Sequence, residues 1–309
     1  MERKDLVKAE SREAVRIDNL TGLLDGFITS LDVKERTKEI YRKALKGFLE
    51  WLSKEGDPQP TRETILRFKE GLRVEHTPGT VTTYLTAVRR FFEWLESEKV
   101  YPNIARGIKG MKRPRGYLKE ALTKEQVRYF IECIPKDDIV GLRDFAIINL
   151  MLRTGLRTIE VIRADIEDIT KESGQLVLRV WGKGRDTKDD FVILTNEAYN
   201  PIMDYIKARG GVSGKDPLFI SYSDRNRGQR LNTRTVRNIV TRWLNKAGLK
   251  SKKVTAHSLR HTTATISILN GADILAVKEM MRHSNINTTM TYIHNLNRVE
   301  KGAEKYVTW

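Results

Sequence analysis

Apolar residues recur at helical spacing through the first third of the chain. They form one stripe in residues 36–54 and a second stripe in residues 84–95, after the turn His-Thr-Pro-Gly-Thr. Between the stripes, Thr61 stands where it can cap a shorter helix. The pattern therefore predicts a small all-helical domain over residues 20–106, preceded by an N-terminal extension, residues 1–19.

The pattern changes after residue 120, where short apolar runs alternate with amphipathic stretches. Thr123 and Gln126 form a capping-box sequence that opens a helix. Gly155 is typical of a left-handed helix end, so a helix is expected from about Leu142 to Arg153. Runs rich in β-formers on either side of Gly-Lys-Gly-Arg-Asp predict a hairpin. The expected elements are a short helix around Glu160, strands at 176–180, 191–194 and 217–220, and helices at 233–247, 257–270, 273–282 and about 287–296.

A basic, helix-breaking stretch, residues 107–120, separates the two regions. Glycines and a proline interrupt any helix there. We interpret it as a linker whose cations contact phosphates, the alternative being a solvated loop. The predicted fold class is mainly α, with an N-terminal all-helical domain and a C-terminal mixed α/β domain, residues 121–309, that contains a small antiparallel β-sheet. The candidate phosphate-binding residues of the linker are Lys109, Lys112, Arg113 and Arg115.

Positive charge exceeds negative charge along the chain and gathers in one stretch. Among 309 residues there are 56 Lys+Arg against 40 Asp+Glu, a formal net charge of +16. From Arg225 to Ala272 no acidic residue occurs, whereas a merely solvated surface normally mixes both signs. The charge indicates a polyanionic partner. The binding candidates in this stretch are Arg225, Arg227, Arg230, Arg234, Arg237 and Arg242.

The sequence argues against several classes of protein. Its single cysteine, Cys133, excludes a disulfide framework and a cysteine-based zinc site within one chain, and its apolar surroundings predict a core position. No apolar run is long enough to span a membrane, and residues 1–16 lack a signal-peptide core. We therefore expect a cytoplasmic, nucleoid-associated protein. Its five histidines lack a set of clustered carboxylates, so no metal and no other cofactor is expected.

Four short motifs carry reactive side chains in one order along the C-terminal region. Each alone is a weak signal, because ion pairs, solvated lysines and core tyrosines are common. Together they supply what phosphodiester cleavage needs: a nucleophile, positive charge for the phosphate oxygens and a proton for the leaving oxygen. The motifs are Thr-Gly-Leu-Arg-Thr-Ile-Glu at 154–160, Trp-Gly-Lys-Gly at 181–184, His-Ser-Leu-Arg-His at 257–261 and the segment 282–292, which ends in a tyrosine.

In order, spacing and predicted setting, these motifs resemble the catalytic domain of the tyrosine recombinase family, in particular its Xer-type and simple phage or transposon integrase members. The resemblance covers most of residues 120–296. It implies a core-binding domain of SAM-like helical fold ahead of the catalytic domain. The catalytic residues that it implies are Arg157, Lys183, His257, Arg260, His283 and the nucleophile Tyr292, with Glu160 orienting Arg157.

The resemblance also implies a reaction and its partners. Members of this family are site-specific recombinases, which cut and rejoin DNA strands through a 3′-phosphotyrosine intermediate and a Holliday junction, without metal or ATP. The implied partners are a double-stranded DNA recombination site and further copies of the chain, as a tetramer on paired sites. The tail, residues 298–309, ends in apolar residues and is expected to dock on a neighbouring protomer.

Some residues depart from the family pattern or extend it. Arg282 stands directly before His283, where the family usually has glycine. Acidic residues follow the hairpin lysine, and Lys188 among them is a second candidate for the proton donor. His261 lies one helical turn after His257 and is expected to support packing or hydrogen bonding.

Two other functions remain open at the level of the sequence. A basic regulator that uses residues 257–282 as a helix-turn-helix would explain the charge, but not Tyr292 or the distant Arg157. A type IB topoisomerase would share the chemistry and work as a single copy. The compact helical domain over residues 20–106 favours the recombinase.

Overall fold

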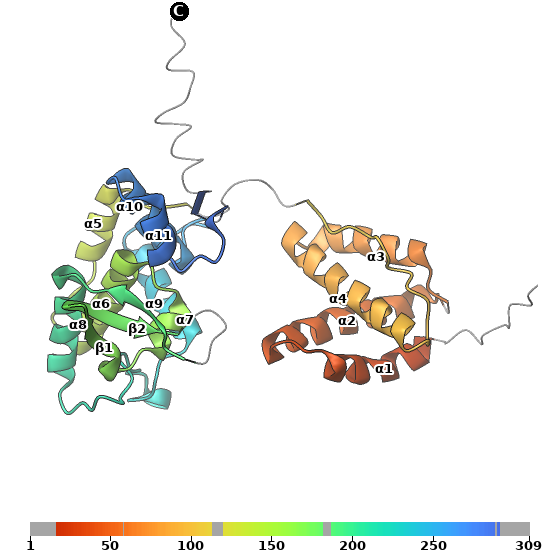
Figure 1. The fold of residues 1–309 in the computed structure, drawn as a ribbon, viewed down its shortest axis with the longest axis horizontal. Helices are drawn as coiled ribbons and strands as arrows, with labels where there is room; N and C mark the ends of the chain where they lie inside the picture. The colour runs from red at the N-terminus through yellow and green to blue at the C-terminus, as the bar shows by residue number, and fades with distance from the viewer. Residues whose placement is uncertain (1–16, 58, 113–119, 182–186, 288, 291–309) are drawn as a thin grey trace, which may run out of the picture. The chain divides into compact units, whose positions relative to one another are not determined.

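The computed structural model describes residues 17–57, 59–112, 120–181, 187–287 and 289–290 (Figure 1). The chain divides into two compact units, Met1–Arg115 and Gly116–Trp309, here the N-terminal and C-terminal units. The division falls within the stretch 107–120. None of the described helices is long and apolar enough to cross a bilayer.

Helices joined by loops make up the described residues of the N-terminal unit, without a strand among them. Its helices are α1 (Ile17–Ser30), α2 (Glu35–Glu55), α3 (Arg62–Glu75) and α4 (Pro78–Ser97). The predicted stripes of α2 and α4 are buried against each other, and their aromatic rings meet edge to face, with the centroids of Phe48 and Phe92 6.0 Å apart. Helix α1 begins at residue 17, inside the predicted extension. The two amphipathic helices predicted from the stripes are therefore confirmed.

Local capping explains where these helices begin and end. Thr61 and Thr64 form a capping box at the start of α3. Thr77 accepts a hydrogen bond from the backbone of Thr80, and Pro78 follows at the first position of α4. Gly56, in the left-handed region at φ 65°, ends α2.

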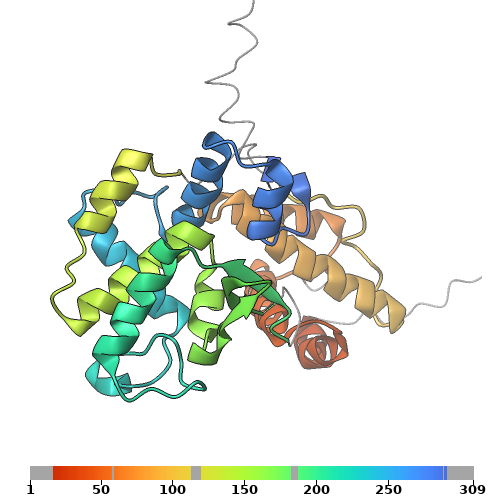
Figure 2. The same ribbon diagram turned by 60° about the vertical axis from the view of Figure 1, so that its left-hand side comes forward.

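The C-terminal unit surrounds one buried helix. That helix, α6 (Ile139–Thr154), is buried along most of its length and packs against other helices of the unit (Figures 1 and 2). The predicted capping box at Thr123 and the left-handed end at Gly155 are both confirmed. The other α-helices among its described residues are α5 (Lys124–Glu132), α7 (Thr158–Arg163), α8 (Asn196–Arg209), α9 (Thr233–Lys246), α10 (Ala256–Leu269) and α11 (Ile274–Met280).

A three-stranded antiparallel sheet of order β1-β2-β3 completes the unit. The predicted hairpin is confirmed as β2 (Gln175–Val180) and β3 (Asp190–Ile193), with Leu178 opposite Val192. Strand β1 (Ile169–Glu172) was not predicted, because its Ile-Thr-Lys-Glu sequence has little apolar pattern. The mainly α fold class with a small antiparallel sheet is confirmed.

Two elements differ from the prediction. Residues 217–220 form isolated bridges rather than a strand, since Pro217 has no N–H to give to a ladder. Helix α8 was not predicted, because Pro201 lies inside it. A proline there leaves the carbonyl of Glu197 without its helical donor, and the side chain of Asn149 on α6 donates to it instead, at 2.6 Å. The predicted helix at about 287–296 lies mostly outside the described residues.

Candidate active site

Arg157 stands between two helices at a sharp change of chain direction. Helix α6 ends at Gly155, with φ 64°, where a Cβ would lie 2.8 Å from the Met281 side chain, so both the backbone and the space favour glycine. Arg157 is the N-cap of α7, and its side chain is 30% exposed. Its Nη1 donates to Oε1 of Glu160 at 2.8 Å, and its backbone N–H donates to Oε2 at 2.6 Å. Glu160 therefore holds Arg157 at the helix start by two bonds.

Helix α10 brings the second arginine to the same place. Arg260 is 2% exposed, and its guanidinium donates to the backbone carbonyls of Gly155 and Met281. One turn away, the rings of His257 and His261 lie 4.9 Å apart, with His257 exposed and His261 buried. The two arginines thus contact neighbouring carbonyls, of Met281 and Arg282, although about a hundred residues separate them in the sequence.

The turn after α11 carries His283. Its Nδ1 lies 2.9 Å from Oγ1 of Thr289, a contact that the sequence analysis did not foresee. Arg282, directly before it, adopts φ 50°, in the left-handed region that glycine favours. The arginine thus takes the backbone conformation for which the family usually has glycine at this position.

Three guanidiniums hold this turn through consecutive backbone carbonyls. Nη1 of Arg282 donates to the carbonyl of Met280 at 2.8 Å, and Arg260 donates to that of Met281. Nη2 of Arg157 lies 3.5 Å from the carbonyl of Arg282 itself. These contacts join the α7 start, α10 and the α11 end, and so bring Arg157, Arg260 and His283 together.

Burial and the surrounding guanidiniums keep His261 and His283 neutral. Burial, and then the charges of Arg260 and Arg157, lower the pKa of His283 to about 4. Burial, followed by the neighbouring His257 and Arg260, lowers the pKa of His261 to about 3. At neutral pH both imidazoles are therefore uncharged, able to donate one hydrogen bond and accept another.

The same guanidiniums that keep His283 neutral keep the carboxyl of Glu160 ionised. Burial by itself would raise the pKa of its carboxyl, but the charges and hydrogen bonds of Arg282 and then Arg157 hold that pKa below its ordinary value. The buried carboxylate is therefore charged and balanced by cations at neutral pH.

Lys188 belongs to a separate charged cluster. Its Nζ lies 2.7 Å from Oδ2 of Asp165 and 2.6 Å from Oδ2 of Asp168. Asp165 also pairs with Arg230, whose guanidinium donates to the carbonyls of Ile162 and Ala164. Burial alone would lower the pKa of Lys188, yet the two carboxylates raise it above its usual value. This pairing disfavours Lys188 as a proton donor.

The other basic candidates differ in how much they are engaged. Arg225, Arg227, Arg234 and Arg237 are exposed, as are Lys109 and Lys112 in the N-terminal unit. Arg242 on α9 is about half exposed, but it is paired with the fully buried Asp144 and lies over the ring of Trp243. Four predicted site residues, Lys183, Tyr292, Arg113 and Arg115, lie outside the described residues.

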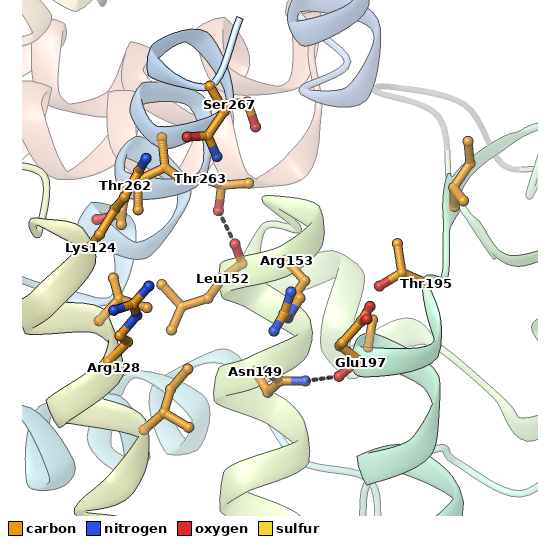
Figure 3. A pocket seen from close by; sticks show the side chains of 16 residues that line it. Lys124, Arg128, Asn149, Leu152, Arg153, Thr195, Glu197, Thr262, Thr263 and Ser267 are labelled. Atoms are coloured by element: carbon orange, nitrogen blue, oxygen red, sulfur yellow. Dashed lines mark hydrogen bonds between the residues drawn. The ribbon is translucent and has the colours of Figure 1, made fainter. Parts of the chain in front are cut away.

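A cavity of about 470 Å³ lies elsewhere in the C-terminal unit, lined from α5, α6, α10 and the start of α8 (Figure 3). It contains the Asn149 bond to the Glu197 carbonyl and a bond from Thr263 to the carbonyl of Leu152. None of the predicted catalytic residues that the structure describes lines it. Within the part of the chain that the structure describes, no group of three or more His, Cys, Asp or Glu residues is arranged to hold a metal ion.

Comparisons with known proteins agree with the geometry. Residues 120–298 match the phage integrase family. The chain is 32% identical over 276 residues to the tyrosine recombinase XerA of Pyrococcus furiosus, covering 87% of this chain and 88% of that protein. It is 30% identical over 284 residues to the tyrosine recombinase XerC of Pelobacter propionicus, covering 90% and 91% of the two chains.

Among solved structures, the fold is similar to that of the XerH site-specific recombinase bound to its palindromic difH substrate in a post-cleavage complex. The TM-score is 0.74 at 24% identity, over 94% of this chain and 84% of that chain. This likeness shows a shared fold.

Proposed function

The chain belongs to the phage integrase family of tyrosine recombinases, and from this premise we propose how its own residues cut and rejoin DNA. It is a site-specific recombinase, an enzyme that acts on DNA. The observation that carries the assignment of residues is the convergence of Arg157, Arg260 and His283 at the turn after α11. A phosphate placed there meets two guanidiniums and a neutral imidazole.

The reaction begins with attack by Tyr292 on the scissile phosphorus. Its hydroxyl oxygen forms the new bond to phosphorus, and the bond from phosphorus to the 5′ oxygen breaks, which leaves a 3′-phosphotyrosine. The ester conserves the energy of the broken bond, so rejoining needs no ATP. Exchange of strands between two sites passes through a Holliday junction.

The guanidiniums and the imidazoles have separate tasks in this scheme. Arg157 and Arg260 neutralise the non-bridging oxygens, since a planar fork matches the geometry of a phosphate. His257 and His283 donate to the phosphate or accept the tyrosine proton. The lowered pKa of His283 favours the first role, because the ring stays neutral and can donate a hydrogen bond, whereas a pKa of about 4 makes it a weak proton acceptor. His261 supports His257 through the ring contact.

The nucleophile is tested by the variant Tyr292→Phe, which loses only the hydroxyl. We expect no covalent protein–DNA adduct on nicked recombination-site DNA, whereas DNA affinity stays nearly unchanged. An adduct that persists in the Phe variant would show that another residue attacks.

The proton for the leaving 5′ oxygen comes from Lys183. We expect Lys183→Ala to block cleavage of ordinary DNA, and a substrate with sulfur at the bridging 5′ position to restore it, because a thiolate leaves without a proton. Lys188→Ala is the matched control, since its amine is held by Asp165 and Asp168. Restoration by sulfur in the Lys188 variant alone would reverse the two roles.

The assembly that we propose is a tetramer on two paired double-stranded DNA sites, acting in the cytoplasm at the nucleoid. The helical domain, residues 20–106, and the catalytic domain, residues 121–309, both bind the DNA, and the linker 107–120 contacts its phosphates. The exposed Lys109 and Lys112 support this role of the linker. Holliday junctions formed from two sites would separate this function from that of a topoisomerase, which needs only one site.

The tail, residues 298–309, docks on the neighbouring protomer in this assembly. An apolar cavity of about 610 Å³ between β3 and α11, lined by Phe191, Ile193 and Met280, supports this proposal, because it can receive aromatic side chains. Deletion after Arg298 should lower recombination and tetramer yield on paired sites but leave binding to a single site. Equal tetramer yield with and without the tail would contradict it.

A further inference from the structure

The side chain of Arg282 is buried and contacts the carboxylate of Glu160 in the active site. Its side chain is 5% exposed, and Nη2 lies 2.7 Å from Oε2 of Glu160, with Nε at 3.4 Å from Oε1. The other partner of that carboxylate, Arg157, is 30% exposed. One carboxylate therefore stands between a buried guanidinium and an accessible one.

The charges of this cluster do not cancel. Two guanidiniums and one carboxylate give the group formed by Arg157, Glu160 and Arg282 a net charge of +1, to which the charge of Arg260 adds, whereas Arg157 and Glu160 alone would form a neutral pair. In a region of low dielectric, a neutral pair attracts an approaching phosphate anion weakly, and a surplus cation attracts it strongly. Since Arg282 is the buried member, the surplus charge is presented through Arg157.

We propose that Arg282 is a positioning residue for DNA cleavage, which takes a share of the Glu160 carboxylate and so leaves the Arg157 guanidinium available to the scissile phosphate. The inference rests on the proposed role of Arg157 as a phosphate ligand. Arg282 itself does not touch the phosphate and acts through its neighbours.

The backbone contacts of Arg282 separate this electrostatic role from a structural one. Its Nη1 bond to the Met280 carbonyl closes the turn that carries His283. A glycine at this position would keep the left-handed backbone without strain but would lose the guanidinium. A glutamine would keep a shorter, uncharged polar side chain, and a lysine would keep the charge without the guanidinium. Comparing glycine, glutamine and lysine at this position therefore separates loss of charge from loss of the turn.

The test compares two substrates that differ only in the charge of the scissile phosphate. One is ordinary DNA, and the other is a methylphosphonate, in which a methyl group replaces one non-bridging oxygen and removes the negative charge. Single-turnover formation of the covalent adduct is measured in the full chain. The ratio of the two rates does not depend on how much of a preparation is folded, because inactive protein lowers both rates equally.

We expect Arg282→Gln and Arg282→Gly each to cleave ordinary DNA roughly tenfold more slowly, and to cleave the methylphosphonate within about twofold of the parent rate. Arg282→Lys keeps the charge and should recover most of the rate on ordinary DNA. The control is Arg179→Gln, which breaks a half-buried Arg–Glu pair of 2.6 Å with Glu172 on the β-sheet and should change neither rate.

Equal slowing on both substrates would overturn the inference, since a purely structural defect is indifferent to the charge of the phosphate. Full activity of Arg282→Gln on ordinary DNA would overturn it as well. Failure of the proposed function looks different: in that case the parent chain itself forms no adduct, or the adduct persists in Tyr292→Phe.

Discussion

The C-terminal unit contains two clusters of acidic and basic side chains that differ in net charge. In the first, Glu160 lies between Arg157 and Arg282, so that one carboxylate faces two guanidiniums. In the second, Asp165 and Asp168 face Lys188 and Arg230, so that two carboxylates meet two cations. The first cluster keeps a surplus positive charge beside the turn after α11, and the second is balanced.

This difference separates the cations that remain available for DNA from those that support the fold. Arg230 was a candidate for DNA binding and Lys188 a candidate for proton transfer. In the balanced cluster, both side chains instead bind Asp165, which follows α7, and Lys188 thereby connects the loop between β2 and β3 to this segment. Arg157 keeps both an exposed surface and a share of surplus charge. Net charge per cluster therefore says more about function than the number of basic residues.

The largest expected difference between the clusters is in stability. Glu160→Gln leaves Arg282 buried without its counter-charge, and breaking a buried pair in this way costs about 3–5 kcal/mol. Asp165→Asn leaves Asp168 to pair with Lys188 and should cost about 1 kcal/mol, as partly exposed pairs do. Urea unfolding of the full chain measures both losses. Equal losses would contradict the distinction between the clusters.

Substitutions in the two clusters should also differ strongly in their effect on the rate of DNA cleavage. Arg157→Lys and Arg260→Lys keep the charge but lose the planar fork, so we expect cleavage to fall about 100-fold, near 3 kcal/mol of transition-state stabilisation. Arg230→Lys in the balanced cluster should stay within about threefold of the parent. Rates of adduct formation at saturating protein measure this. If Arg157→Lys cleaves DNA at the parent rate, the forked contact between Arg157 and the phosphate is not needed for cleavage.

The histidines beside the first cluster and the carboxylates of both clusters should respond to acid in different pH ranges. The folded pKa values of His261 and His283, about 3 and about 4, lie below the ordinary value of 6.5, so the unfolded chain binds protons first as the pH falls. The stability contributed by the neutral imidazoles is therefore complete above about pH 6.5 and is lost as the pH falls from there to about 4 for His283 and about 3 for His261. The lowered carboxyl pKa values of Glu160 and Asp165 add a loss that begins only near pH 4.5.

Urea midpoints at pH 7.5, 6 and 5 measure the histidine part. We expect the midpoint to fall across this range in the parent chain and to fall less in His261→Gln, which has no titrating ring. A midpoint that is constant from pH 7.5 to 5 would show that these histidines titrate normally in the fold.

The smallest expected effect is on the salt dependence of DNA binding. Arg237, exposed on α9, should release about one counterion on binding, so Arg237→Gln should flatten the log–log salt slope by about 1. Arg230→Gln should flatten it by less than about half as much, since Asp165 already neutralises that charge. Anisotropy titrations at several salt concentrations compare the two. A larger effect of Arg230 would mean that it exchanges Asp165 for a DNA phosphate.

Much of the fold was predictable because its signals are local. The apolar stripes of α2 and α4, the caps at Thr61 and Thr123, and the end at Gly155 all depend on residues within a few positions of one another. Helix α8 escaped prediction because the bond that replaces the one lost at Pro201 comes from Asn149, 48 residues from its acceptor. No local pattern carries that information.

The sequence by itself determined the surplus of positive charge, the family to which the motifs belong and the order of the side chains that carry its chemistry. Only the tertiary structure decided which cations are balanced and which are not. The pair of Arg282 and Glu160 spans 122 residues, and that of Arg230 and Asp165 spans 65. Coulomb energy depends on distance in space and desolvation on burial, and the fold sets both. For that reason the same arginine side chain is a buried partner at position 282 and an accessible one at position 157.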